Sequence, residues 1–164
     1  MHSFLILLLL AGVPMRLSAQ ATSPDELAIQ MVIEHETQAY LDRNTDRQSA
    51  CWADSTGLSQ RICLNDGRII AADGDHAALR RGLESYFRQL PDPDPSVFEH
   101  RHYKIRIRGE AAFVTFVQIM QCAGRPASYS QQVRYLEREA GSWKIIHSGV
   151  SYYDPTSRQV QASR

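Results

Sequence analysis

The chain has 164 residues, of which 43% are hydrophobic, and its 18 basic residues balance 18 acidic ones to give a formal net charge of zero. This balance argues against a nucleic-acid-binding protein, and no run of Lys or Arg marks a helix that lies on a membrane surface. The length suits one domain with one hydrophobic core. We therefore expect a globular domain that binds neither nucleic acid nor a metal or other cofactor.

The first residues have the pattern of a secretory signal. Residues 4–10 are nearly all apolar, and the small residues Ala19 and Ala21 follow at the two positions that a signal peptidase reads. The apolar run is too short to span a bilayer. The pattern predicts a cleaved signal peptide over residues 1–21, export to the periplasm or the medium, and no membrane span in the mature form.

One domain is expected over residues 22–154, with a flexible tail over 155–164. Export permits a disulfide, but the chain has three cysteines, so at least one thiol stays unpaired in a monomer. If one bridge forms, the pairing of Cys51 with Cys63 is favoured, because both flank the same chain reversal. The alternative, in which these two and Cys122 are buried free thiols, has equal weight, and the spacing does not fit a zinc site.

Three helices are predicted. A capping Ser23, a proline and two acids start the first, which should run to about Arg43. The residues that share its inner face at helical spacing are Ile29, Val32, Ile33, Glu36 and Tyr40. A short second helix is expected over 46–52, and a third over 76–90, where a proline-rich connector ends it.

The remaining segments read as strands. The turn signal Asn65-Asp66-Gly67 separates two short strands. The predicted strands cover residues 58–64, 68–72, 98–108, 111–121, 128–139 and 142–153. This order predicts an α+β fold, a cone-shaped curved antiparallel sheet with three helices packed on its concave side.

Pairing across the predicted turns assigns residues to faces of the sheet. A turn at Gly109-Glu110 sets Arg101 opposite Gln118, and a turn at Ala140-Gly141 sets Arg134 opposite His147. The inner face is then apolar at one end and polar at the other. The polar end is expected to hold Arg101, Gln118, Gln132, Arg134 and His147, as the floor of a pocket.

The opposite face is expected to be uneven. Polar residues that alternate along the first long strand, namely His100, His102, Lys104, Arg106 and Arg108, are typical of a solvated edge. The other strands are apolar on this face as well, through Phe113, Val117, Ile119, Val133, Tyr135 and Ile146. No helix is left to cover them, so we expect a homodimer through the outer face of the sheet.

The chain resembles the nuclear transport factor 2-like superfamily, which includes SnoaL-like and ketosteroid-isomerase-like proteins. The resemblance covers residues 25–153 and rests on the segments 34–40 and 112–114, on Trp52, and on Gln132 through His147. It is closest to exported bacterial members that are mostly uncharacterised. It implies the cone-shaped fold, but the superfamily includes enzymes, binding proteins and assembly modules.

Two relatives within the superfamily bear on function. Residues 133–138 with Trp143 and His147 are also similar to the association domain of calcium/calmodulin-dependent protein kinase, in which arginines line a deep pocket, and Arg134 matches one of them. Ketosteroid isomerase carries its general-base Asp where this chain has residues 59–61, Ser-Gln-Arg. Isomerisation by that mechanism is therefore disfavoured.

Arg134 is the strongest candidate for a ligand-binding residue, because a partly buried guanidinium needs an anionic partner. It either recognises a carboxylate-like ligand, together with Arg101 as a second bidentate donor, or forms an internal ion pair with Glu36. Both can hold if Glu36 only orients the arginine. His147 is either a general acid or base or a satisfied core histidine. Tyr40 and Trp52 either line a cavity or belong to the core.

The preferred hypothesis is a small-molecule-binding domain whose ligand is largely apolar and anionic. Its expected ligand-binding residues are Arg134, Arg101, Gln118, Gln132, Tyr40, Trp52 and Glu36. The alternatives are an isomerase, cyclase or dehydratase that uses His147, or a dimeric assembly module.

Overall fold

The computed structural model describes residues 22–156, so the predicted signal segment 1–21 and residues 157–164 of the predicted tail lie outside the described residues. The described elements are, in chain order, α1 (Pro24–Leu41), α2 (Thr45–Ser49), β1 (Leu58–Cys63), β2 (Ile69–Gly74), α3 (His76–Gln89), β3 (Val97–Arg108), β4 (Ala111–Gln121), β5 (Ser128–Glu139) and β6 (Ser142–Tyr153). Each predicted helix and strand is present, within a few residues of its expected ends. None of the described helices is long and apolar enough to cross a membrane.

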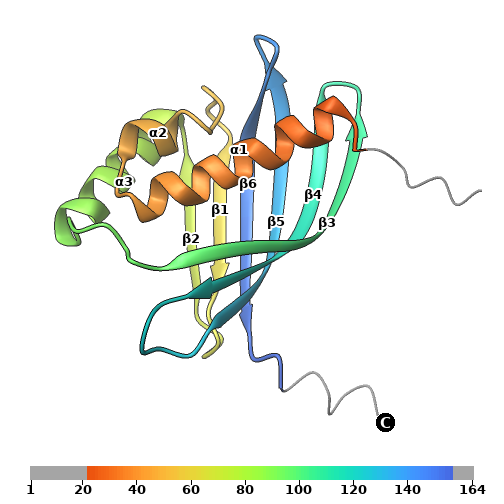
Figure 1. Cartoon of the computed structure of the whole chain (residues 1–164). Coiled ribbons are helices and arrows are strands. Elements are labelled where there is room, and N and C mark those ends of the chain that lie inside the picture. Colours follow the sequence, from red (N-terminus) through yellow and green to blue (C-terminus); the bar gives the residue numbers. More distant parts are fainter. Residues whose placement is uncertain (1–21, 157–164) are drawn as a thin grey trace, which may run out of the picture.

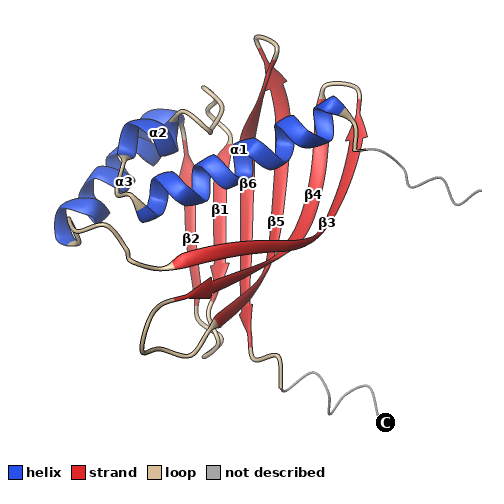
Figure 2. Ribbon diagram, viewed as in Figure 1, coloured by secondary structure: helices blue, strands red, loops and turns tan. Residues whose placement is uncertain are grey.

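The six strands form one curved sheet in the order β2-β1-β6-β5-β4-β3. The three helices lie on the same side of it, with α1 running across the strands (Figures 1 and 2). The predicted α+β class is confirmed. One pairing was not predicted: β1 lies parallel to β6 and joins the short hairpin to the four-strand meander. As a result β2 and β3 are the two edges of the sheet.

Helix α1 is fixed at its start and along its inner face. Ser23 and Glu26 form a capping box, in which each side chain accepts a hydrogen bond from the other residue's backbone N–H. Ile29 and Ile33 are fully buried against the sheet. The same stripe continues to Glu36, which is only 5% exposed. The sequence pattern therefore aims an acidic side chain into the interior.

The predicted position of Arg101 is wrong, because β3 contains a bulge. The register of β3 against β4 shifts between Arg101 and Lys104, and His102 between them has a positive φ of 59°. An extra residue on one strand reverses which side chains face inward. Arg101 is consequently on the outer face, exposed and paired with Glu99, and His100 takes the inner position opposite Gln118.

The predicted position of His147 is wrong for the same reason. The register of β5 against β6 shifts after Leu136, which pairs with Ile145 as expected. Beyond the bulge, Arg134 pairs with Ser148, and His147 pairs with Tyr135 on the outer face. Arg134 itself is 4% exposed on the inner face, so its predicted orientation is confirmed.

All three cysteines are free thiols in the structure. The favoured pairing of Cys51 with Cys63 is therefore not observed. The alternative of three buried free thiols is correct for the free state, but only Cys51 is buried, and Cys63 and Cys122 are half-buried. Burial raises the pKa of the Cys51 thiol to about 11, so this side chain is protonated and unreactive at neutral pH.

Arg43, directly after α1, ties this helix to α3 and to the proline-rich connector. Its guanidinium lies over the rings of Tyr40, Tyr86 and Phe87, at 5.1 to 5.6 Å from their centroids. It also donates to the carbonyl oxygen of Asp92 and pairs with Asp94 at 3.5 Å. Arg43 therefore reinforces the direct contacts of Tyr40 on α1 with Tyr86 and Phe87 on α3.

We predict that Arg43→Ala lowers the free energy of unfolding by about 2 kcal/mol, because it removes cation–π contacts and charge-assisted hydrogen bonds from a largely buried side chain. Urea denaturation measures the change. The matched control is Arg81→Ala, at an exposed position of α3, which should change stability by less than about 0.5 kcal/mol. Equal effects of the two substitutions would contradict the role given to Arg43.

Candidate functional site

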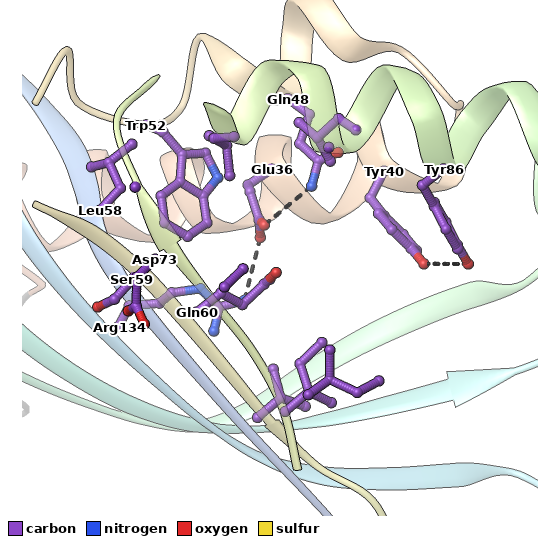
Figure 3. A pocket seen from close by; sticks show the side chains of 18 of the residues that line it. Glu36, Tyr40, Gln48, Trp52, Leu58, Ser59, Gln60, Asp73, Tyr86 and Arg134 are labelled. Carbon is purple, nitrogen blue, oxygen red and sulfur yellow. Dashed lines mark hydrogen bonds and ion pairs between the residues drawn. The ribbon is translucent and has the colours of Figure 1, made fainter. Parts of the chain in front are cut away.

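A cavity of about 520 Å³ lies between the helices and the inner face of the sheet. Its walls are mainly apolar and come from strands and from α3; among them are Leu58, Ile62, Ile70, Leu79, Leu83 and Val150. Its volume is typical of sites that hold small molecules. Figure 3 shows polar side chains, including Glu36, Gln48 and Arg134, that also line this space.

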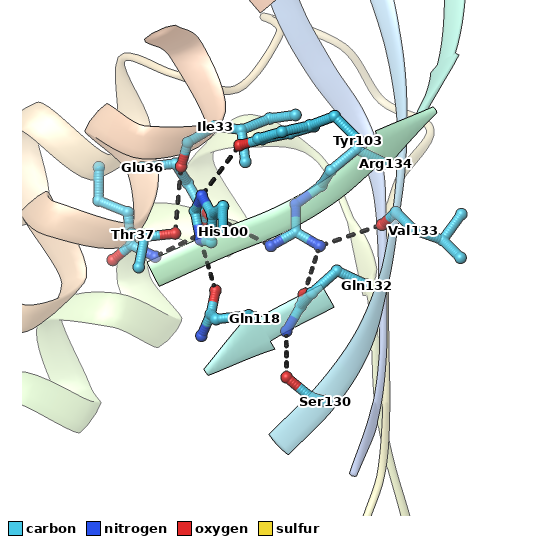
Figure 4. A network of polar contacts seen from close by, with 11 residues as sticks. Ile33, Glu36, Thr37, His100, Tyr103, Gln118, Ser130, Gln132, Val133 and Arg134 are labelled. Atoms are coloured by element: carbon cyan, nitrogen blue, oxygen red, sulfur yellow. Dashed lines mark hydrogen bonds and ion pairs between the residues drawn. The ribbon is translucent and has the colours of Figure 1, made fainter. Parts of the chain in front are cut away.

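The polar floor is built around one ion pair. Arg134 Nη2 on β5 lies 3.3 Å from Glu36 Oε2 on α1, and the two side chains are 4% and 7% exposed (Figure 4). A buried charge without a partner is costly, so the two residues stabilise each other's charged forms. Of the two interpretations of Arg134 drawn from the sequence, the internal ion pair with Glu36 is therefore observed. It also leaves the floor of the cavity without net charge.

The remaining contacts of Arg134 hold its guanidinium in place. Nη1 donates to Gln132 Oε1 at 2.9 Å and to the carbonyl oxygen of Val133 at 3.0 Å. Gln132 in turn donates to Ser130 Oγ at 2.8 Å. The guanidinium carbon lies 5.6 Å from the centroid of the Phe116 ring. Arg134 is thus held on three sides by polar or aromatic groups of the inner face.

Three buried polar atoms on residues that line the cavity have no hydrogen-bond partner within residues 22–156. They are Gln48 Oε1, Trp52 Nε1 and Arg134 Nε. The amide nitrogen of Gln48 is used, since it donates weakly to Glu36 Oε1 at 3.5 Å. Buried polar groups are nearly always paired in native proteins. These three atoms are buried behind the surface of the cavity, so a bound molecule would reach them only if a neighbouring side chain moved.

A second network orients Gln118. His100 Nε2 lies 3.0 Å from Gln118 Oε1, and His100 Nδ1 lies 2.9 Å from the Tyr103 hydroxyl (Figure 4). Burial lowers the pKa of His100, so the neutral ring accepts from Tyr103 at Nδ1 and donates to Gln118 at Nε2. With its oxygen bound to His100, Gln118 keeps its amide nitrogen for the cavity that it lines.

The opposite side of the cavity has a rim of tyrosines. The hydroxyls of Tyr40 and Tyr86 are 2.9 Å apart, and the two rings are stacked (Figure 3). Tyr152 on β6 lines the same space. Burial raises the pKa of Tyr40, so its phenol stays protonated. Tyr86 is 39% exposed, which places this rim at the opening of the cavity.

Six of the eight predicted site residues line the cavity: Glu36, Tyr40, Trp52, Gln118, Gln132 and Arg134. Arg101 and His147 do not. His147 instead lies near Ser59, with 2.7 Å between Nδ1 and the serine Oγ, and burial together with the charge of Arg61 lowers its pKa. Other residues of the cavity, such as Gln48 and Tyr152, were not predicted, nor was His100, which orients Gln118 from behind the cavity wall. The outward alternation of β3 concealed His100, and a five-residue α2 shows no periodicity that could reveal Gln48.

Residues 22–156 contain no cluster of three or more His, Cys, Asp or Glu side chains suited to a metal ion. The polar groups of the cavity are amides, an indole, hydroxyls, the ion pair of Glu36 with Arg134, and two carboxylates. Of these carboxylates, Asp73 pairs with Arg61 and Asp75 accepts a hydrogen bond from the Ala78 N–H at the start of α3. Arg134 is the one cation among the described lining residues and is paired with Glu36, so the cavity has no free positive charge for a bound molecule.

We predict that Glu36→Ala lowers the free energy of unfolding by about 3 to 5 kcal/mol, because it leaves the charge of Arg134 buried without a partner. Chemical denaturation measures the loss. Replacing both partners by apolar residues, Glu36→Leu with Arg134→Met, should restore most of the stability. A double variant no more stable than Glu36→Ala would contradict the view that the two charges mainly compensate each other.

No protein-family model matches the chain, and no curated protein matches it. Solved structures do match. An NTF2-like protein of unknown function from Pseudomonas putida is 19% identical, with a TM-score of 0.61 over 81% of this chain and 90% of the other. A ketosteroid isomerase-like protein from Erwinia carotovora atroseptica is 18% identical, with a TM-score of 0.57 over 81% and 99% of the two chains.

A third solved structure is the CaMKII hub of S. rosetta, which is 15% identical, with a TM-score of 0.60 over 77% of this chain and 95% of the hub. At these identities the likeness concerns the fold alone. The described chain therefore has the fold of the nuclear transport factor 2-like proteins, as the resemblance of its sequence predicted.

Proposed function

We propose that the protein binds a small, mainly apolar and uncharged molecule in the cavity between the sheet and the helices. The observation that carries the proposal is the buried pair of Glu36 and Arg134, which lies beside unpartnered polar atoms in an otherwise apolar space. An apolar molecule would fill the cavity, and one polar group of that molecule would pair with a lining donor such as the amide nitrogen of Gln118.

An anionic ligand was expected from two arginines, and this expectation loses its support. Arg101 lies outside the cavity. The charge of Arg134 is already balanced by Glu36, so a ligand carboxylate would have to displace a buried carboxylate or be buried beside it. Placing two like charges together in an apolar interior is unfavourable. A neutral ligand with hydrogen-bonding groups avoids this cost.

An enzyme that uses His147 is the alternative that the geometry supports less. His147 faces the outer side of the sheet and does not line the cavity. A general acid or base must lie within hydrogen-bonding reach of the reacting group. The proposal therefore assigns binding to the cavity and no proton transfer to His147.

We further propose that the domain forms a homodimer through the outer face of the sheet. Phe113 is 47% exposed there, beside Val133 and Tyr135 on the neighbouring strand. Helices cover only the other face (Figure 2). An uncovered apolar face is typical of an association surface. Separately from the dimer, we propose that the protein is exported, on the basis of the sequence pattern of residues 1–21.

Two fluorescent dyes that share the same ring system test whether the cavity prefers a neutral or an anionic ligand. They are neutral N-phenyl-1-naphthylamine and anionic 8-anilinonaphthalene-1-sulfonate. The wild-type protein should bind the neutral dye about tenfold more tightly, which corresponds to about 1.4 kcal/mol. Glu36→Gln should remove this preference or reverse it, because the charge of Arg134 then lacks its partner. Fluorescence titration measures both affinities.

The matched control for the dye experiment is Glu99→Gln. This substitution also removes one carboxylate, but on the exposed outer face, so the ratio of the two affinities should stay as in the wild type. Tighter binding of the sulfonate by the wild type, or an unchanged ratio in Glu36→Gln, would refute a neutral binding site.

Light scattering after gel filtration tests the dimer. We predict twice the chain mass for the wild type and the single mass for Phe113→Glu, because a carboxylate would then be buried in the interface. Leu27→Glu, at a similarly exposed apolar position on α1, should remain dimeric. A monomeric wild type, or equal dissociation of both variants, would rule out the proposed interface.

A further inference from the structure

The two edges of the sheet are protected to different degrees. Edge strand β3 carries the exposed basic residues Lys104, Arg106 and Arg108 at every second position, together with the bulge at His102. Charged side chains and bulges are the means by which natural sheets prevent another strand from pairing with an edge. The β3 edge is therefore closed to strand addition.

Edge strand β2 has neither form of protection. No charged residue or proline occurs from Ile69 through Ala72, and Ile69 and Ile70 are 64% and 53% exposed. The charges at its two ends are paired within the chain: Arg68 with Asp66 at 2.7 Å, and Asp73 with Arg61 at 2.8 Å. The centre of this edge is therefore uncharged, apolar and open.

The hydrogen bonds of the hairpin show which backbone groups of β2 are directed outward. Leu64 N–H donates to the carbonyl oxygen of Arg68 at the turn. Hydrogen-bonded pairs alternate along an antiparallel ladder. In the observed register Ile70 and Ala72 therefore bond to β1, and the N–H and C=O groups of Ile69 and Ala71 point away from it. These are the groups that a further strand would use.

The same edge lies beside the opening of the cavity. Ile70 and Ala72 on β2 line the cavity and are exposed, as are Gly82 and Tyr86 on α3. The opening therefore lies between the β2 edge and α3. A strand laid along β2 would place every second side chain toward this opening, since alternate side chains face the same side.

We propose that the free edge of β2 binds an extended, uncharged polypeptide segment with apolar side chains at alternate positions, as a seventh strand of the sheet. Backbone hydrogen bonds to Ile69 and Ala71 would hold the segment, and its inward side chains would enter the groove between β2 and α3. The segment is expected to be uncharged because the centre of the β2 edge is itself uncharged and has no group that would pair with a charged side chain.

A peptide segment fits this edge better than a second copy of the chain. Six residues extend over roughly 20 Å, and a sheet is about 10 Å thick, so the edge offers an area on the order of 200 Å². A stable interface between folded proteins buries roughly 800 Å² per partner. A flexible segment also reaches the groove beside α3. The inference does not rest on the small ligand proposed above, because edge pairing needs only the backbone of β2.

The test uses the full-length chain and a capped, fluorescein-labelled peptide of three Thr-Val repeats with a lysine at each end. Fluorescence polarisation should show binding that Ala71→Pro weakens at least tenfold, because proline removes an outward N–H and leaves the ladder to β1 intact. Ala71→Val, which keeps the N–H, should bind within about twofold of the wild type. Hydrogen exchange of Ile69 and Ala71 should slow when the peptide is added.

A second peptide, with proline in place of the central threonine, tests the same contact from the other side and needs no change in the protein. It should lose binding to the wild type. Absence of binding by the first peptide, equal affinity in Ala71→Pro, or unchanged exchange at β2 would each overturn the proposal. A wild-type dimer that Ala71→Pro dissociates would also overturn it, because the occupant would then be a second copy.

Discussion

The buried contact between Glu36 and Arg134 is the constraint on which the interior of this protein depends. It joins the middle of α1 to the inner face of β5, and both side chains are almost fully removed from water. A guanidinium cannot lose its charge, so α1 has to lie where its carboxylate meets that charge. The same contact neutralises the floor of the cavity, and the proposed preference for uncharged molecules rests on this neutralisation.

The sheet presents three surfaces with different chemistry. Its inner face is polar only around Arg134 and Gln118 and otherwise apolar. Its outer face has exposed aromatic and aliphatic side chains such as Phe113, which no helix covers. The edge strand β2 is apolar and carries unpaired backbone groups on its outward side. The proposed dimer would use the outer face, whereas the proposed small-molecule site and the proposed strand addition meet at the opening between β2 and α3.

The sequence was sufficient to predict the order of the elements and the orientation of Arg134. Turn residues such as Gly67 and Gly141 require positive φ and locate the hairpins. On β5 the alternation is unbroken from Leu136 to Gln132, so Arg134 was assigned to the correct face. The bulges could not be predicted in this way, because His102 adopts its positive φ without a glycine to signal it.

Each bulge reversed the assignment of a polar residue. On β3, Arg101 and His100 are both polar, so hydrophobic alternation gave no means of telling which one faces inward. On β6, the extra residue moved His147 to the outer face. The partners of Gln48 depend on how α2 packs against α1, which no local pattern records. Contacts close to a turn were thus predictable, and contacts beyond an irregularity were not.

The most direct test of a neutral binding cavity is a crystal structure of the wild-type protein soaked with N-phenyl-1-naphthylamine. The account predicts density for the dye among Leu58, Leu79 and Val150, with the ion pair of Glu36 and Arg134 intact. Dye bound only outside the cavity, or an Arg134 side chain that has left Glu36, would contradict it.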